Sequence, residues 1–230
     1  MRHRICLSAA FCFVLALPAA AGMQYKVTIV NQIPGGPDTG QPFSPPVAVV
    51  HNSGYSMFEP GGWATPGLER VSREGDPSVL QSEALASPNV YSVVVGTGPY
   101  FDQQVFMING NPGNLFSVAW MLGRSNDEFS GLHDVVLPAS GTSEYDLQAW
   151  DSGTEVNTGL IQDIPFYGNH NVGPDEHNPI GTLSSYTVHN DPTYGVLIWN
   201  FPPVAHVSIE AEGPTPSQET TWGEVKSLYR

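Results

Sequence analysis

The chain has 230 residues, with 8 Lys and Arg against 22 Asp and Glu, so its formal net charge is −14. This charge excludes a basic surface for nucleic-acid phosphates, so we expect no nucleic-acid partner. The 24 Gly and 21 Pro residues argue against long helices, while a hydrophobic content of 40% is sufficient for a packed core.

The first 21 residues have the three parts of a secretory signal peptide. Positions 2–4 are basic, positions 5–17 are almost entirely apolar, and small residues lead up to Ala21. The apolar run is shorter than the roughly 20 residues that span a bilayer. We therefore expect cleavage after Ala21 and export to the periplasm or the extracellular space, with no transmembrane segment left after cleavage.

The predicted cleavage changes the chemistry of the mature chain. Both cysteines, Cys6 and Cys12, lie in the signal peptide, so disulfides and catalytic thiols are excluded from the mature protein. Loss of Arg2 and Arg4 would change the formal charge from −14 to −16. No Asn begins an N-x-[ST] sequon, which favours a bacterial source over a eukaryotic secretory one.

Eight segments of the mature chain have the composition of β-strands. They are rich in β-branched and aromatic residues, and clusters of Gly, Pro and Asn separate them. The eight segments are residues 25–30, 45–51, 89–97, 104–108, 115–122, 145–150, 195–201 and 206–212.

Two short helices interrupt this pattern. Thr65 and Pro66 form a helix start before 68–71, and Gly75 follows as an end signal. Asp76 and Pro77 repeat the start signal before 79–85. Strands divided by turns, with helices this short, indicate an all-β fold, an antiparallel β-sandwich of about eight strands.

The mature chain is expected to form one domain over residues 22–212. Within it, residues 163–191 are rich in Gly, Asn, His and Pro without clear periodicity, which predicts a long irregular loop. Residues 213–230 follow as a polar linker and a short C-terminal tail.

Acidic residues concentrate after two of the predicted strands. Asp127 and Glu128 follow the strand at 115–122, and Asp151 and Glu155 follow the strand at 145–150. If these two strands run in the same direction, both turns open at one end of the sandwich. Grouped carboxylates repel one another unless a cation neutralises them, and Ca²⁺ prefers such oxygen ligands. The alternative is that Asp151 and Thr154 only cap their own turn.

Two sequence elements around these acids resemble a known family. N-D-E-F-S-G-L at 126–132 and W-D-S-G-T-E at 150–155 are similar to the spondin N-terminal domain family (the F-spondin/mindin-type domain), in its bacterial exported branch. The resemblance runs from Tyr25 to Glu155 and continues weakly to Glu210. It implies an antiparallel β-sandwich that binds one Ca²⁺ at a loop end.

The resemblance also implies the metal ligands, which fall on Asp127, Asp151 and Glu155. Glu155 stands where animal members have Asp, and its longer side chain would bind in a bidentate manner or shift the ion outward. Ser152 replaces the usual Ala, which we expect to be harmless.

Other site types have weaker support. Zinc ligands could come from the 163–191 segment, but H-E-x-x-H or a comparable spacing is absent. The residues concerned are His170, Asp175, Glu176, His177, His189 and Asp191. A serine nucleophile lacks the G-x-S-x-G elbow. A glycosidase would need two carboxyl groups, but Asp127 and Asp151 are better explained as metal ligands.

We therefore expect no catalytic residue and no enzyme activity. The sequence predicts an exported calcium-binding module of adhesion type whose ligand is an extracellular protein or glycan. The alternative is a calcium-supported carbohydrate-binding module or carbohydrate-active enzyme, which an exposed aromatic side chain near the acidic turns would favour. Trp63 lies in a predicted loop and is the best candidate, whereas Trp120 and Trp199 belong to predicted strands and the core.

Overall fold

The structure, a computed structural model, describes residues 22–170 and 173–214. The predicted signal peptide at 1–21 and the predicted C-terminal tail lie outside the described residues. Within these residues, no helix is long and apolar enough to cross a membrane.

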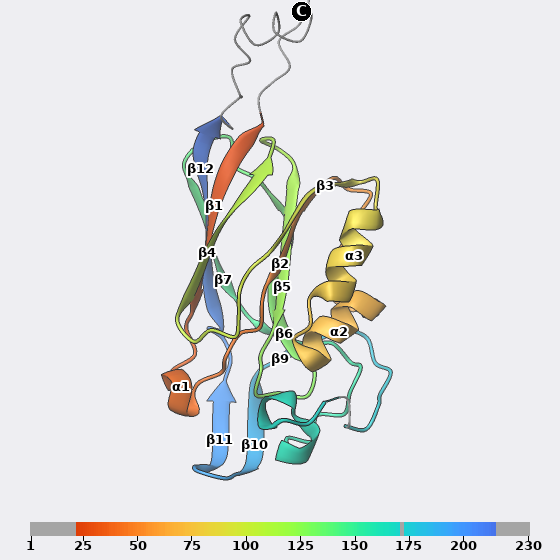
Figure 1. Cartoon of the computed structure of the whole chain (residues 1–230), viewed down its shortest axis with the longest axis vertical. Helices are drawn as coiled ribbons and strands as arrows, with labels where there is room; N and C mark the ends of the chain where they lie inside the picture. Colours follow the sequence, from red (N-terminus) through yellow and green to blue (C-terminus); the bar gives the residue numbers. More distant parts are fainter. Residues whose placement is uncertain (1–21, 171–172, 215–230) are drawn as a thin grey trace, which may run out of the picture. The chain divides into compact units, whose positions relative to one another are not determined.

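Two antiparallel sheets form a sandwich (Figure 1). The four-stranded sheet has the order β4-β1-β12-β7, and the six-stranded sheet has the order β3-β2-β5-β6-β8-β9. Their bounds are β1 Met23–Asn31, β2 Val47–His51, β3 Val90–Val95, β4 Gln103–Gly110, β5 Leu115–Met121, β6 Glu128–Val136, β7 Thr142–Leu147, β8 Ala149–Asp151, β9 Gly181–Leu183 and β12 Ala205–Pro214. A separate hairpin pairs β10 (Ser185–Asp191) with β11 (Gly195–Asn200).

The main core lies between the two sheets. Alternate residues of β1, Tyr25, Val27 and Ile29, are fully buried, as the period of two in a strand requires. They pack with side chains from the facing sheet, including Phe116 and Trp120 of β5. In the sequence, β1 was recognisable by its β-branched residues and by the turn cluster that follows Asn31.

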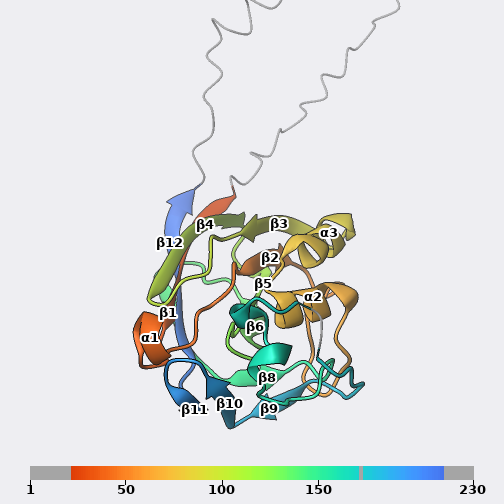
Figure 2. The same ribbon diagram turned by 60° about the horizontal axis from the view of Figure 1, so that its bottom comes forward.

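A second apolar layer lies on the outer face of the six-stranded sheet. The helices α2 (Pro66–Glu74) and α3 (Ser78–Ala86) cover this face, and Leu68 and Leu80 pack on Phe129 and Trp150 (Figures 1 and 2). Because β2 lies between both layers, all five of its residues are buried. The helix start at Thr65 is confirmed, since its Oγ1 accepts a hydrogen bond from Leu68 N at 3.2 Å. Three further helical turns complete the described chain: α1 Gly36–Thr39, η1 Ile161–Asp163 and η2 Pro165–Tyr167.

The prediction of an antiparallel sandwich is confirmed, but the described residues form twelve strands rather than eight. The predicted strand at 145–150 is two strands, β7 and β8, which belong to different sheets. The chain passes from one sheet to the other at Gln148. Hydrophobic composition alone does not show such a crossing.

Two further expectations were wrong in part. Residues 125–129 were expected to be a turn, but β6 begins at Glu128, and its polar residues hide the strand pattern. Residues 163–191 were expected to be irregular, but they contain η2, β9 and β10. In β10, Tyr186 and Val188 are buried on alternate positions among polar neighbours, so too few apolar residues mark the strand.

The pairing register shows which loops lie at each end of the sandwich. Met23 pairs with Pro214, so β1 begins and β12 ends side by side. Met23 also pairs with Gly110, and β5 leads from that end of the sandwich toward the other. The acidic turns after β5 and β8 therefore lie at the end opposite to Met23 and Pro214 (Figure 1).

Candidate functional site

The acidic turns meet at one end of the six-stranded sheet, which we call the loop end and define as residues 122–128 and 151–159. Strands β5 and β8 each pair antiparallel with β6, so β5 and β8 run in the same direction. The condition set by the sequence is therefore met, and both turns open together.

Asp127 organises the loop that follows β8. Its Oδ2 accepts hydrogen bonds from Thr154 N at 2.7 Å, Glu155 N at 2.9 Å, Ser152 Oγ at 2.8 Å and Thr154 Oγ1 at 3.1 Å. Its other oxygen, Oδ1, is buried and has no hydrogen-bond partner among the described residues. The carboxylate thus shapes the loop with one oxygen and leaves the other free.

Asp151 makes the turn contacts that the alternative interpretation predicted. Its Oδ1 accepts a hydrogen bond from Gly153 N at 2.7 Å, and its Oδ2 accepts one from Asn157 Nδ2 at 2.8 Å. Gly153 has φ of 69°, a conformation that side chains disfavour, so glycine is needed for the curl. Local capping by Asp151 is therefore real, and it leaves further lone pairs on both oxygens.

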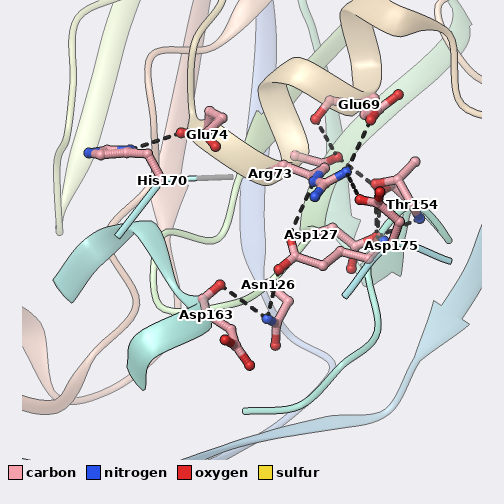
Figure 3. Close-up of polar contacts among 12 residues, drawn as sticks. Glu69, Arg73, Glu74, Asn126, Asp127, Thr154, Asp163, His170 and Asp175 are labelled. Atoms are coloured by element: carbon pink, nitrogen blue, oxygen red, sulfur yellow. Dashed lines mark hydrogen bonds and ion pairs between the residues drawn. The ribbon is translucent and has the colours of Figure 1, made fainter. Parts of the chain in front are cut away.

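Glu155 is bound by an arginine that the sequence did not single out. Arg73 projects from α2 (Figure 3), and its Nε lies 3.2 Å from Glu155 Oε2. The same guanidinium contacts Glu69 at 3.2 Å and Asp175 at 2.8 Å. A Cβ on Gly173 would lie 1.3 Å from Glu155 Oε1, so the chain passes directly over this carboxylate. The charge of Glu155 is therefore offset inside the protein.

Asn126 joins the surrounding loops. Its Nδ2 donates to Glu155 Oε1 at 3.3 Å and to Asp163 O at 3.2 Å, and its Oδ1 accepts from Gly159 N at 3.1 Å. The hydroxyl of Tyr186 donates to Asn126 Oδ1 and accepts a hydrogen bond from the backbone N–H of Asn126 at 3.1 Å. Asn126 thus fixes residues 155–163 against the start of β6.

Glu128 is the most unusual group at the loop end. It is fully buried, and neither of its carboxylate oxygens has a hydrogen-bond partner among the described residues. In the β6–β8 register it lies directly opposite Asp151, so the two acids share one face of the sheet. Buried polar groups are almost always hydrogen bonded, and like charges at opposed positions destabilise a sheet.

The electrostatics agree with a local excess of negative charge. Burial raises the pKa of Asp127, and burial together with the charge of Asp127 raises the pKa of Glu128. Burial raises the pKa of Asp151 to about 6, and the charge of Asp127 adds to this shift. Burial also raises the pKa of Glu155 to about 7, although Arg73 opposes the shift. Positive charge at this end would favour the ionised carboxylates.

We tested whether these residues fit a calcium ion. Their donors fit, because the free atoms, Asp127 Oδ1 and both Glu128 oxygens, are hard carboxylate oxygens. Their arrangement fits only in part, because Glu155 is already paired with Arg73. Across residues 22–170 and 173–214, no group of three or more His, Cys, Asp or Glu side chains is placed to hold a metal ion.

The residues considered for zinc have other contacts. His170 Nδ1 lies 2.8 Å from Glu74 Oε2, and His177 stacks on Trp63. Asp191 accepts hydrogen bonds from Tyr167 Oη and from two backbone amides in its turn. The structure therefore does not bring them together as a site.

The tryptophan expectations are confirmed. Trp120 and Trp199 are buried in the core, whereas 55% of the surface of Trp63 is exposed. Trp63 and the Gly153–Thr154 part of the loop end line one cavity. An exposed aromatic side chain thus lies next to the acidic turns.

Comparison with known proteins identifies the family of this chain. A search of curated proteins finds no match, but the Spondin_N family matches residues 26–163. This match covers more than half of the chain and includes both acidic elements, and it confirms the resemblance found in the sequence. The chain belongs to the Spondin_N family.

Proposed function

We propose that this protein is an exported, non-catalytic binding module of adhesion type. Its loop end would bind Ca²⁺ through Asp127, Asp151 and Glu155, and its ligand would be a protein or glycan outside the cytoplasm, in the periplasm or beyond the cell. The observation that carries the proposal is the group of buried carboxylate oxygens at Asp127 and Glu128 without partners. Membership in the Spondin_N family is consistent with an extracellular module without catalysis.

Each proposed ligand has a defined task in the loop. Asp127 holds the backbone of Thr154 and Glu155 with Oδ2, so Oδ1 is kept in place for a cation. Asp151 fixes the turn at Gly153 while its remaining lone pairs stay available. A bound Ca²⁺ would offset the negative charge that these side chains bring together. The loop end would then present a rigid surface to a partner.

Glu155 requires an exchange of partners. Arg73 and Asn126 hold its carboxylate in the structure, so it would have to give up at least one of these contacts to bind a metal. Arg73 has Glu69 and Asp175 as further partners, so its charge would remain compensated. Although burial opposes the charged form of Arg73, its contacts with Asp175 and Glu155 raise its pKa, and the guanidinium remains protonated.

Thermal unfolding of the chain in EDTA and in excess Ca²⁺ tests the proposal. Binding to the folded state alone at 100 times the dissociation constant adds about 2.7 kcal/mol of stability. The Asp151→Asn variant should lose most of this gain, whereas Asp102→Asn, at an exposed position, should keep it. Equal melting temperatures in EDTA and Ca²⁺ would rule out the metal site.

The Arg73→Gln variant then shows whether Arg73 alone, or Arg73 together with Ca²⁺, neutralises the carboxylates of the loop end. If Ca²⁺ and Arg73 share this role, removal of the guanidinium should enlarge the stabilisation by Ca²⁺, because Glu155 becomes free. If Arg73 alone neutralises the loop end, the variant should be destabilised equally in EDTA and in Ca²⁺. Breaking a buried ion pair typically destabilises a protein by about 3–5 kcal/mol.

A further inference from the structure

A cavity of about 440 Å³ lies beside the loop end. Trp63 lines one side, and its indole stacks on His177 with ring centroids 4.2 Å apart and an angle of 16° between the rings. More than half of the Trp63 surface is nevertheless exposed. The stacking covers one face of the indole and holds the ring in one orientation, so a ligand in the cavity would have to pack on its other face.

Backbone hydrogen bonds hold the other walls. Glu176 N donates to Thr154 O at 3.1 Å, and Asn178 N donates to Gly153 O at 2.9 Å. Ile180 exchanges backbone bonds with Gly61 and Gly62, just before Trp63. The segment at 174–180 therefore connects the Trp63 loop to the loop after β8. Backbone hydrogen bonds thus connect the segments that line the cavity.

Polar side chains line the same cavity as the indole. Glu69, Asp175 and Glu176 supply carboxylates, Asn178 supplies an amide, and Thr154 supplies a hydroxyl group. The one guanidinium, that of Arg73, is already paired with Glu69, Asp175 and Glu155. Three carboxylates against one guanidinium leave the cavity with a net negative charge, which makes it a poor site for an anion. Because Arg73 binds Glu69 and Asp175, Glu176 is the carboxylate of the cavity without an ion pair among the described residues, and it can accept hydrogen bonds from a ligand.

We propose that this cavity binds a neutral carbohydrate. A pyranose ring has a face of C–H groups that packs on an indole, and its hydroxyl groups donate in the plane of the ring to carboxylate and amide oxygens. The carboxylates exclude uronic acids and other acidic sugars by repulsion. The inference rests on the proposed role as a binding module, but it does not require the calcium site.

Isothermal titration with neutral trisaccharides, namely cellotriose, N,N′,N″-triacetylchitotriose and maltotriose, tests the inference, with trigalacturonic acid as the acidic probe. At least one neutral sugar should bind, and the acidic sugar should not. Trp63→Ala should weaken binding about tenfold or more. Tyr91→Ala is the matched control, because Tyr91 is 56% exposed and lies outside the cavity, and it should leave the affinity unchanged.

A second variant tests the role of charge. Glu176→Gln should weaken neutral-sugar binding about tenfold, since a charged acceptor is lost, without weakening any residual binding of the acidic sugar. The inference is wrong if no neutral sugar binds, if Trp63→Ala binds as well as the wild type, or if a tri-lysine peptide binds in their place.

Titrations in EDTA and in Ca²⁺ separate this inference from the proposed function. Binding that depends on Trp63 and persists in EDTA supports the sugar site even if the calcium proposal fails. Binding that needs Ca²⁺ but ignores Trp63 places the sugar elsewhere and contradicts the inference. Release of reducing sugar from a bound trisaccharide would show an enzyme and overturn the proposed function.

Discussion

Two regions of the six-stranded sheet bury polar side chains in different ways. In the first, formed by His51, Ser117 and Asp134, the buried side-chain groups are paired. His51 Nδ1 lies 2.9 Å from the carbonyl of Asn52, which only accepts, so Nδ1 carries the proton and donates. Nε2 lies 2.8 Å from Ser117 Oγ, and Ser117 Oγ accepts a hydrogen bond from Asp134 N at 3.0 Å.

The loop end is the second region, and here several buried polar atoms lack a hydrogen-bond partner in the part of the chain that the structure describes. Asp127 Oδ1 and both oxygens of Glu128 are buried without a hydrogen-bond partner among the described residues. A satisfied buried network stabilises a fold, whereas an unsatisfied buried charge requires compensation. The comparison therefore separates a structural polar cluster from a region where we expect a ligand.

The first region also bears on catalysis. A serine hydroxyl next to a histidine is the arrangement of a nucleophile and its base. However, Ser117 and His51 are both fully buried, so a substrate has no access to them. Asp134 has φ of 55°, and its backbone N–H bonds to Ser117 at the irregular β5–β6 pairing. This cluster fixes the backbone, which agrees with the proposal of a module without catalysis.

Replacing Asp127 by Ala tests the loop end with the largest expected effect. Two backbone amides and two hydroxyl groups lose their acceptor, so the free energy of unfolding should fall by about 3 kcal/mol. Urea unfolding followed by circular dichroism measures the change. Asp102→Ala, at an exposed position, is the control. A loss below about 1 kcal/mol would mean that Asp127 does not organise the loop.

Replacing Ser117 by Ala tests the satisfied cluster. His51 Nε2 and Asp134 N both lose their partner, so stability should fall by about 2 kcal/mol, equally in EDTA and in Ca²⁺. Ser82→Ala, on the exposed side of α3, should change stability by no more than about 0.5 kcal/mol. A Ca²⁺-dependent loss in Ser117→Ala would contradict the division into two regions.

The sequence predicted those parts of the fold that local patterns encode. β-Branched residues marked β1, and the Thr65 and Gly75 signals marked both ends of α2. Motifs placed Asp127, Asp151 and Glu155 at one end, and the pairing of β5 and β8 with β6 confirmed that both turns open there.

Contacts between residues far apart in the sequence could not be predicted from such local patterns. Arg73 and Glu155 are 82 positions apart, and no spacing rule connects a helix residue to that loop. Glu128 was read as part of a turn because a carboxylate rarely starts a buried strand. Its burial depends on three strands and Tyr186 meeting around it, which is a tertiary property.

Replacing Glu128 by Gln should change stability in the opposite direction to Ser117→Ala. The substitution keeps the shape and removes a carboxyl group whose raised pKa destabilises the fold at neutral pH, so stability in EDTA should rise by about 1 kcal/mol. In saturating Ca²⁺ the gain should shrink, because the metal would compensate the wild-type charge. Urea unfolding under both conditions measures the two values. A loss in EDTA comparable to that of Ser117→Ala would show that Glu128 is satisfied after all.

Replacement of Asp191 should give the smallest change in stability. Asp191 is a buried acid whose oxygens accept hydrogen bonds, as the buried groups of the His51–Ser117 cluster do. Burial opposes its charge, but bonds from Tyr167 Oη, Tyr194 N and Thr193 N outweigh burial and lower its pKa below the ordinary value of 3.8. Because the folded-state pKa is depressed, the ionised carboxylate stabilises the fold above the unfolded-state pKa. This contribution is lost as the pH falls through the folded-state pKa. Asp191→Asn should therefore cost about 1 kcal/mol at neutral pH. The difference from wild type should begin to shrink near pH 3.8 and vanish once the pH is below the lower folded-state pKa, as urea unfolding at a series of pH values would show. A difference that is constant with pH would mean that the charge of Asp191 contributes nothing and that shape alone matters.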